Sequence, residues 1–565
     1  MGSKVHQKTE EIFKEVGEFG TYQLFIFILV GFISFIPAIV GYSFSFYAAT
    51  PNFRCKIPNY TNDTYEIQNV FHKSLIEKYI PLSNDKSFKD IYDKCKLKIY
   101  LNESQLMLSE KKNISLVKCN EWVYSKEYYE STLITEWNLV CDKSAKRSLF
   151  STFYFIGTYG VILSGILSDK LGRKKTAYVF IIANALLNIC LSFLISYEFE
   201  NTNIQQILFT VVRFFCGIAS NVYAVSVVIA MEIVGPSKRV TAANSIYYLY
   251  IIGEFVVLFF AYFIRNYKYF YMSCTAIMTS FAFIFWLVPE SPRWLMTKQR
   301  YHEAYTIFNK IAKSNKRDIT SLVELQDLKT SSLKNRKKDE HNIVSPINDK
   351  LNNSEENKEK ILSALDTLKI FFKSTKLIIR SSVLLLNWLT NTLVYYGISF
   401  NTNELFGDPY LNFGLSVLVE LIAILVTHVT LERYGRKIPY CINMALTGIS
   451  LLFVLFVPQD MGFLITICAL IGKFSISFTY NTVYIITAES HPTVIRNSAV
   501  SICQSFARMG AIIAPNIQLL GEIFWYPIPF IVYGAFSTIS AFLFIIFMPE
   551  SKFIKLPDTI EEFIQ

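Results

Sequence analysis

The stretch Asp169-Lys-Leu-Gly-Arg-Lys-Lys175 recurs as Glu432-Arg-Tyr-Gly-Arg-Lys-Ile438, 263 positions later (432 − 169). Arg213-Phe-Phe recurs as Lys473-Phe-Ser after 260 positions (473 − 213). Pro289-Glu-Ser recurs as Pro549-Glu-Ser, also after 260 positions (549 − 289). Matches in one order at a nearly constant offset predict two homologous halves. A binding site is then expected between the halves, near the middle of a membrane.

Long apolar blocks surround these motifs and place the chain in a bilayer. Of the 565 residues, 52% are hydrophobic and only 18% are charged, whereas soluble proteins carry about 25% charged residues. A helix needs roughly 20 apolar residues to cross a bilayer. The blocks predict an all-α membrane protein with twelve spans, at Tyr22–Tyr47, Leu149–Ser168, Thr176–Ser196, Ile207–Val228, Ala242–Ile264, Tyr269–Val288, Ser381–Ser399, Leu411–Leu431, Ile438–Val457, Phe463–Tyr484, Ser498–Gln518 and Ile528–Phe547.

Two polar stretches interrupt the blocks, and the second divides them into six and six. The predicted order is a segment 1–21, a six-helix half 22–289 with a large loop 48–147, a central loop 290–380, a second half 381–548 and a segment 549–565. The basic residues behind the net charge of +10 lie between apolar blocks and not along one face. This pattern argues against a nucleic-acid partner and is typical of membrane topology.

Lysine and arginine gather in alternate short loops, which predicts the orientation of the chain. They are abundant at 170–175 and 433–437 and absent from 197–206 and 401–408. We therefore expect a plasma-membrane protein with both termini and the central loop in the cytoplasm. The loop 48–147 is expected outside.

The first polar loop carries a second, independent indication of an extracellular location. It holds four cysteines, Cys55, Cys95, Cys119 and Cys141. Four glycosylation sequons lie in the same loop, at Asn59, Asn62, Asn102 and Asn113. Cysteines and sequons in one polar segment predict two disulfides and attached glycans on an oxidising side of the membrane. Three pairings of the cysteines are possible, and the sequence does not choose among them.

The repeated turns contain residue types suited to a conformational latch. Gly172 and Gly435 allow a turn too tight for other residues, and acidic and basic side chains beside them can pair with neighbouring helix ends. Glu232 and Arg239 also recur, as Glu489 and Arg496, each after 257 positions (489 − 232; 496 − 239). The gating candidates are Asp169, Gly172, Arg173, Glu232, Arg239, Glu432, Gly435, Arg436, Glu489 and Arg496. The alternative is that the basic residues only anchor the topology.

These residues carry a family resemblance. Gly165-Ile-Leu-Ser-Asp-Lys-Leu-Gly-Arg-Lys174 resembles a loop signature of the major facilitator superfamily. Within it, Ser131-Thr-Leu-Ile-Thr-Glu-Trp-Asn-Leu-Val-Cys141, Pro289-Glu-Ser-Pro-Arg-Trp-Leu295 and Glu489-Ser-His-Pro-Thr-Val-Ile-Arg496 resemble solute carrier family twenty-two, the organic cation, anion and zwitterion transporters. Gly407–Asn412 and Leu556–Ile560 resemble its carnitine/organic cation branch. The resemblance implies a twelve-helix major facilitator fold in two six-helix halves, working by alternating access.

Five charged residues interrupt the apolar spans: Arg213, Glu254, Glu420, Lys473 and Arg508. A charge at bilayer depth is costly unless it is paired or hydrated, so each is a functional candidate. Arg213 and Lys473 hold equivalent repeat positions, which favours either a shared structural role or substrate contact. Glu254 has no charged counterpart, because Ala514 stands 260 positions further on (514 − 254). It either lines the cavity or pairs with a neighbouring base.

Arg508 belongs to a polar stripe on an otherwise apolar span. Ser501, Gln504, Ser505 and Arg508 have helical spacing, so they share one face. The resemblance implies that cation carriers bear an aspartate at the Arg508 position, whereas anion and carnitine carriers bear an arginine. It also implies that Glu420 matches an acid of cation and carnitine carriers. A guanidinium holds a carboxylate bidentately, so a zwitterion is one candidate substrate. The alternative is a structural Arg508–Glu420 pair.

Tyrosines in the spans could complete the cavity. Tyr395 and Tyr480 lie on faces that also carry asparagine or serine, and tyrosine attracts ammonium groups by cation–π interaction. The alternative is ordinary helix packing.

We find no enzyme motif, cofactor motif or metal-ligand cluster; sodium or proton coupling stays open. The sequence predicts a secondary transporter of organic cations or carnitine-like zwitterions, functional as a monomer. The alternatives are an organic anion carrier, a sugar porter and a non-transporting glycoprotein receptor.

Overall fold

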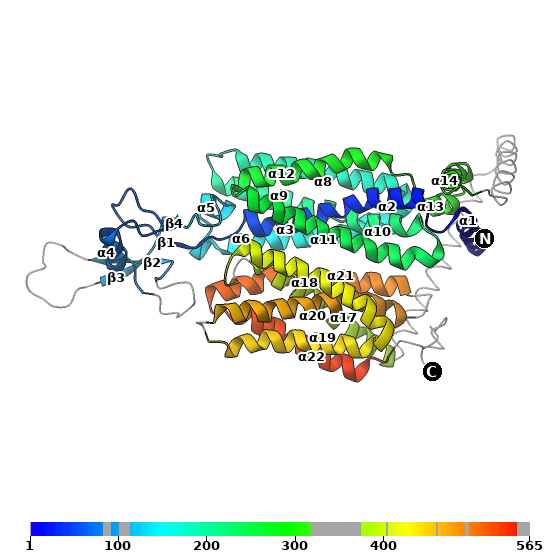
Figure 1. Ribbon diagram of the computed structural model, residues 1–565. Coiled ribbons are helices and arrows are strands. Elements are labelled where there is room, and N and C mark those ends of the chain that lie inside the picture. The colour runs from blue at the N-terminus through cyan, green and yellow to red at the C-terminus, as the bar shows by residue number, and fades with distance from the viewer. Residues whose placement is uncertain are drawn as a thin grey trace, which may run out of the picture.

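The computed structural model describes residues 2–82, 92–100, 114–317, 375–402, 405–458, 461–491 and 496–550. Asn102, Asn113 and the Leu556–Ile560 segment lie outside the described residues, as does the Arg496 side chain. Helices form two bundles that lie side by side (Figure 1). The first bundle contains α2 (Thr21–Ile33), α3 (Phe35–Tyr47), α6 (Ala145–Gly157), α7 (Val161–Leu171), α8 (Arg173–Ser196), α9 (Thr202–Ala219), α10 (Val222–Glu232), α11 (Arg239–Phe263) and α12 (Tyr267–Ile284).

The second bundle is built from the C-terminal part of the chain. It contains α17 (Thr375–Phe400), α18 (Pro409–Tyr434), α19 (Lys437–Phe453), α20 (Gly462–Glu489), α21 (Arg496–Ile523) and α22 (Ile528–Phe547). Eleven helical segments of the described chain are long and apolar enough to cross a membrane. α21 completes the twelve but is not among these eleven. Polar residues along it, including Gln504, Arg508 and Asn516, interrupt its apolar surface.

Three spans predicted as single helices are each broken into two. The breaks fall at Ser34, at 158–160 and at 220–221. At two of them a serine hydroxyl donates to a backbone carbonyl three residues earlier, Ser34 to Gly31 at 2.5 Å and Ser220 to Gly217 at 2.9 Å. Such bonds compete with the helical ladder and bend a helix. A periodicity count does not detect this local competition.

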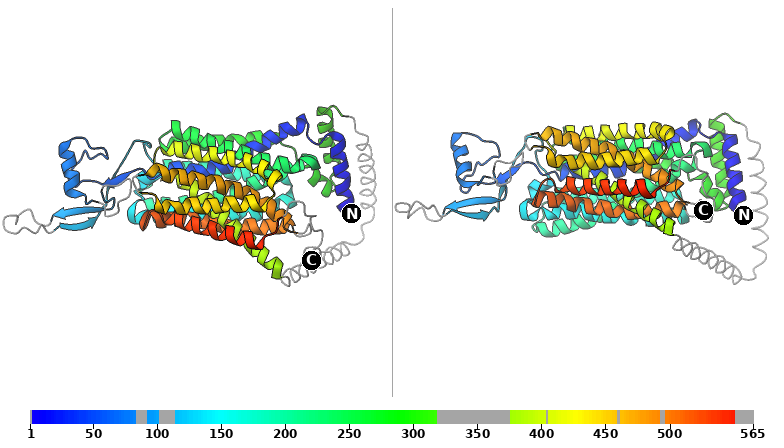
Figure 2. Two further views of the ribbon diagram at one scale, coloured as in Figure 1. Left: turned by 60° about the horizontal axis from the view of Figure 1, so that its bottom comes forward. Right: turned by 90° about the horizontal axis from the view of Figure 1, so that it is seen from below.

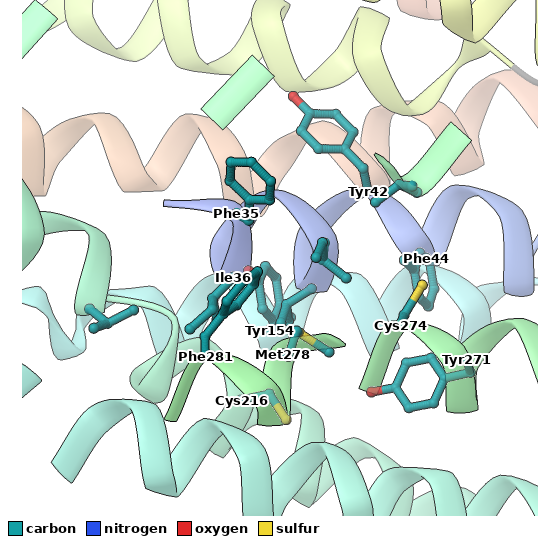
Figure 3. Close-up of a cluster of buried hydrophobic side chains, with 14 of the residues drawn as sticks. Phe35, Ile36, Tyr42, Phe44, Tyr154, Cys216, Tyr271, Cys274, Met278 and Phe281 are labelled. Carbon is teal, nitrogen blue, oxygen red and sulfur yellow. The ribbon is translucent and has the colours of Figure 1, made fainter. Parts of the chain in front are cut away.

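The first bundle has a dense aromatic core. Phe35, Tyr154, Tyr271 and Phe281 are buried in it (Figure 3). α6 and α9 approach closely where Gly157 faces Gly217, since an added Cβ on either glycine would collide with the backbone of the other helix. Small residues at such crossings let membrane helices pack without the hydrophobic drive available in water.

Two small domains lie at opposite ends of the bundles (Figure 2). At the end we call the loop end, strands β1 (Phe53–Cys55) and β4 (Trp122–Tyr124) pair antiparallel, as do β2 (Lys96–Tyr100) and β3 (Ile114–Lys118). The short helix α4 (Val70–Tyr79) belongs to this domain, whereas α5 (Leu133–Trp137) packs on the first bundle. At the turn end, where Gly172 and Gly435 lie, α1 (Gly2–Val16) packs on α13 (Pro292–Thr297) and α14 (Tyr301–Ser314).

Disulfides and a buried ion pair hold the loop domain together. Cys55 is bonded to Cys119 and Cys95 to Cys141, one of the three pairings that the sequence allowed. The Asp63 carboxylate accepts from Arg54 Nη1 at 3.0 Å and lies 2.9 Å from His72 Nε2. Burial disfavours the ionised form of Asp63, but the hydrogen bonds from Arg54, from the Ile57 amide and from His72 outweigh it and lower its pKa.

Candidate functional site

Two of the predicted intramembrane charges form an ion pair where the two bundles face each other, and a third, Glu254, lies near them. Lys473 on α20 lies 2.6 Å from Glu420 Oε2 on α18. The Lys473 ammonium also donates to Ser399 Oγ at 2.7 Å and lies 3.7 Å from the centre of the Tyr395 ring. Glu420 and Lys473 are 0% and 1% exposed. A buried ion pair of this kind needs further hydrogen bonds to offset its desolvation.

Tyrosine hydroxyls supply those bonds and link the ion pair to the other bundle. Tyr395 on α17 donates to Glu420 Oε1 at 2.7 Å. Tyr247 on α11, in the first bundle, donates to the same oxygen at 2.5 Å. Tyr42 on α3 donates to the Tyr395 hydroxyl at 3.1 Å. In Figure 3 the Tyr42 ring points out of the first-bundle core toward the second bundle. The site is therefore shared by both halves at mid-span.

One of the sequence alternatives is corrected by this geometry. The Arg508–Glu420 pair is wrong, because Lys473, Tyr247 and Tyr395 occupy the Glu420 carboxylate. Arg213 and Lys473 are both buried but have different partners. Arg213 lies 4.8 Å and 4.7 Å from the ring centres of Phe44 and Tyr154 and donates to a backbone carbonyl. Pseudo-symmetric positions keep the charge but meet different neighbours, since the side chains around them are not repeated.

Arg508 stands apart from the ion pair, on α21. Four tyrosines from three helices lie near it and form what we call the tyrosine wall: Tyr154, Tyr396, Tyr480 and Tyr484. Arg508 and Gln504 are partly exposed, and Tyr484 is 37% exposed. Tyr480 stacks on Tyr395 with ring centres 5.2 Å apart, so this wall backs onto the Glu420 pair. Within the residues described, Arg508 has no carboxylate partner.

Glu254 is the remaining buried charge. It lies on α11, is 1% exposed, and interacts electrostatically with Glu420, Lys473 and Tyr42. Its Oε1 atom has no hydrogen-bond partner among the described residues. The expected alternatives were a cavity-lining position or a pair with a base. The neighbouring base, Lys473, is instead held by Glu420 and Ser399.

The repeated turns form ion pairs at the turn end. Gly172 adopts a positive φ of 107° and Gly435 one of 90°, the backbone region that favours glycine. Arg173 lies 3.0 Å from Glu232 and 2.7 Å from Asp169. In the second half Arg436 lies 3.2 Å from Glu489. Each of these pairs stays within its own bundle.

Two acidic residues that we did not predict complete these turns. The Glu290 carboxylate accepts from the backbone N–H groups of Arg173 and Lys174, at 2.8 Å and 3.0 Å. Glu550 does the same for Arg436 and Lys437, at 2.9 Å and 3.0 Å. A carboxylate is stabilising at a helix N-terminus, where backbone donors are free. The repeated Pro-Glu-Ser motif was the signal that could have identified them.

Other gating candidates have different surroundings. Glu432 lies near the end of α18, beside the Gly435 turn. Arg239 contacts Glu10 of α1, and Arg293 of α13 lies 2.5 Å from the same carboxylate. Arg239 therefore ties the first bundle to the turn-end domain and does not extend the Arg173 cluster. The partner of Arg239 is Glu10 of α1, an acidic residue that no motif spacing indicated.

Polar contacts also join the bundles at the loop end. Arg147 on α6 lies 2.9 Å from Glu522 on α21. Asn516 bonds to Ser148 at 3.2 Å and to Thr152 at 3.1 Å. These contacts hold α21 against α6. The two halves are thus in contact from the site to the loop end.

Comparison with known proteins agrees with this architecture. Residues 100–563 match the family described as Sugar (and other) transporter. The Organic cation transporter protein of Drosophila melanogaster is 33% identical over 98% of this chain and 94% of that protein. The human Organic cation/carnitine transporter 2 is 30% identical over 98% of this chain and 94% of its own. A structure of the E. coli xylose transporter XylE, in a partially occluded inward open conformation, superposes with a TM-score of 0.58 at 13% identity. It covers 94% of this chain and 100% of XylE.

Two bundles of six spans with a charged site between them define a secondary transporter of the major facilitator fold, not an enzyme. The chain belongs to the sugar and other transporter family, and within it to solute carrier family 22. The fold and the family that the sequence predicted are confirmed.

Proposed function

We propose that this chain carries small organic cations across the plasma membrane, and among them zwitterions that bear both an ammonium group and a carboxylate. The relatives named organic cation and organic cation/carnitine transporters support the first part. Arg508 supports the second, because it is a permanent cation with no carboxylate partner in the described part of the chain. A guanidinium held in a protein interior needs an anionic or hydrogen-bonding ligand.

The surroundings of Arg508 suit a substrate with two poles. The tyrosine wall beside it offers aromatic faces that attract a quaternary ammonium. Behind the wall, the hydroxyl groups of Tyr395 and Tyr247 donate hydrogen bonds to the negatively charged Glu420 carboxylate. A carboxylate bound at Arg508 would leave the ammonium end of a short zwitterion among these rings. Tyr395, Tyr480, Gln504, Glu420 and Glu254 thus remain our candidate binding residues, with Arg508.

The proposed orientation puts the turn end and both termini in the cytoplasm and the disulfide-bonded domain outside. Asn59 and Asn62 are exposed on that domain, as glycan acceptors must be. Enzymatic deglycosylation should increase gel mobility, and joint replacement of Asn59, Asn62, Asn102 and Asn113 should remove the shift. A shift that survives this replacement contradicts the orientation.

In this orientation the contacts between Arg147 and Glu522 close the outer side. We propose that the protein functions as a monomer.

Uptake by cells expressing the protein tests the proposed function. The panel contains labelled carnitine, tetraethylammonium, an aromatic carboxylate and glucose, each with and without sodium. We expect saturable uptake of carnitine, tetraethylammonium or both, and none of glucose. Uptake of the aromatic carboxylate alone would show an anion carrier, and uptake of glucose alone a sugar porter. No uptake at normal surface expression would contradict transport and favour a receptor.

A further inference from the structure

A cavity at the loop end lies between the two bundles, apart from the mid-span site. Its walls come from α3 and α6 of the first bundle and from α17 and α21 of the second. Its empty volume is about 440 Å³, part of which is open to solvent. Two aromatic rings, Phe44 and Phe400, and two charged side chains, Arg147 and Glu522, line it together with serine hydroxyls. The cavity therefore offers both charges and apolar faces to a small molecule.

The two charged side chains of the cavity form an ion pair between the bundles. Arg147 Nη1 lies 2.9 Å from Glu522 Oε1 and also donates to Thr50 Oγ1 at 3.0 Å. The side chains of Arg147 and Glu522 are 13% and 32% exposed. Water screens such a pair only in part, so separating the two charges without new partners is unfavourable.

The cavity lies between the loop end and the Arg508 site. Glu522 stands 14 residues beyond Arg508 on the same helix (522 − 508), which is about 21 Å along its axis. Phe400, in the cavity wall, stacks on Tyr396 of the tyrosine wall with ring centres 5.9 Å apart. A molecule that enters from the loop end therefore meets the cavity first and Arg508 second.

The charge of the entering molecule decides how easily this ion pair separates. A simple cation compensates Glu522 but is repelled by Arg147, and a simple anion meets the reverse situation. A zwitterion brings a carboxylate for Arg147 and an ammonium group for Glu522, so both charges keep a partner when the pair separates. A guanidinium binds a carboxylate bidentately, and aromatic rings attract a quaternary ammonium.

We propose that this cavity is an outer binding site for zwitterions, and that a bound zwitterion opens the Arg147–Glu522 pair by replacing it. The inference rests on the proposed function and orientation. The ion pair then acts as a charge filter before the Arg508 site. Zwitterions pass it faster than simple cations, because complementary charges speed association and like charges slow it.

Uptake by variants at equal surface expression tests the filter. The measured quantity is the uptake efficiency, maximal velocity divided by KM, for carnitine relative to tetraethylammonium. Arg147→Met should lower this ratio by about tenfold or more, since the carboxylate loses a charged hydrogen-bond partner and the cation loses a repulsion. The charge-swapped variant Arg147→Glu/Glu522→Arg keeps one charge of each sign and should restore the ratio. Lys56→Met, in the exposed Lys56–Glu121 pair of the loop domain, is the matched control and should leave the ratio unchanged.

Inhibition from outside tests binding in the cavity separately from transport. In Arg508→Asp the inner site is expected to reject carboxylates, so the carboxylate of external carnitine is recognised only in the cavity. Adding Arg147→Met to this variant should raise the carnitine concentration that halves tetraethylammonium uptake by about tenfold or more. The half-inhibitory concentration of choline, a cation without a carboxylate, should not rise.

The inference is overturned if Arg147→Met leaves the carnitine-to-tetraethylammonium ratio unchanged. It is also overturned if uptake of both substrates falls equally and the charge-swapped variant does not restore the ratio, which would show a purely structural pair. Arg147→Gln replaces Arg147→Met if the latter does not reach the surface, and the ratio decides if Arg508→Asp transports neither substrate. Wild-type uptake of tetraethylammonium without carnitine would contradict only the filter, whereas uptake of neither would contradict the proposed function itself.

Discussion

Arg508 and Lys473 are two cations of the same bundle with opposite surroundings. Lys473 is neutralised by Glu420 at 2.6 Å and is 1% exposed. Arg508 is partly exposed and lies near tyrosines. The first arrangement satisfies the charge within the protein, and the second leaves it for a ligand. We therefore expect mutations at the two positions to affect different properties, Arg508 selectivity and Lys473 stability.

Substitution of Arg508 should change the charge preference of transport. Arg508→Asp should abolish uptake of carboxylate-bearing substrates and allow simple cations. Arg508→Lys keeps the charge but loses the bidentate fork, which should raise the carnitine KM by about tenfold or more. The measurement is surface-normalised uptake of carnitine and tetraethylammonium. If Arg508→Ala transports both as the wild type does, the zwitterion hypothesis is wrong.

Breaking the Glu420–Lys473 pair should reduce stability more than removing both charges. Glu420→Gln or Lys473→Met leaves a buried, unpaired charge and should cost about 3–5 kcal/mol, whereas the double variant should recover part of this loss. Thermal stability of the detergent-purified protein, followed by size-exclusion chromatography, measures the effect. Equal losses in the single and double variants would show that the pair is not the stabilising unit.

Among the helices, the starts of α8 and α19 are built alike. In both, a glycine with positive φ precedes the first helical turn, and a carboxylate from the distant Pro-Glu-Ser motif caps its backbone N–H groups. An arginine in that turn then reaches an acid at the end of another helix. These elements lie far from the charged site and do not contact it. Their effect on transport should therefore act through the populations of the conformational states.

Replacement of Arg173 should lower turnover without weakening substrate binding. Arg173→Ala removes bonds to both Glu232 and Asp169, so the balance between states should shift while the site is unchanged. We expect maximal velocity to fall by about tenfold, within the range of conformational coupling energies, with KM changed little. Asp169→Ala, which removes one exposed partner, should have a smaller effect. An unchanged maximal velocity at equal surface expression would count against a latch.

The loop domain should lose stability in acid because of Asp63. Its pKa in the folded protein is lowered, so the ionised form stabilises the fold above the ordinary carboxyl pKa of about 3.9. This contribution is lost as the pH falls through the lower, folded value. Limited proteolysis between neutral pH and pH of about 3 should show increasing cleavage of the loop domain. Asp63→Asn should be cleaved more readily at neutral pH and should respond less to acid; an identical acid response would contradict this role.

For the whole molecule, contact between the halves is distributed unevenly along the membrane normal. The described polar contacts between bundles lie at mid-span and at the loop end, where Arg147 and Asn516 take part. The latch pairs at the turn end lie within single bundles. An alternating-access cycle requires the loop-end contacts to separate when substrate enters from that side.

A cross-link at the loop end should stop transport. Ser148 Oγ and Asn516 Oδ1 are 3.2 Å apart, so cysteines at both positions are close enough to be joined by an oxidant. Uptake by the double-cysteine variant should be lost on oxidation and return after mild reduction. The single-cysteine variants, treated in the same way, control for the native cysteines. Undiminished uptake in a fully cross-linked sample would show that these helices do not separate.

The sequence by itself determined the membrane class, the two-half organisation and the family, because these depend on local composition and on motifs repeated along the chain. It also identified the buried charges of the membrane spans, since a charged residue in an apolar block is visible without any coordinates. Only the tertiary structure decided which charges are paired. Lys473 and Glu420 are 53 positions apart (473 − 420) and meet because α18 and α20 pack together. The cap by Glu290, the contact of Arg239 with Glu10, and the hydroxyls of Tyr42 and Tyr247 likewise depend on helices that only folding brings together. Pairing is a property of three-dimensional distance, and no spacing along a chain of helices fixes that distance.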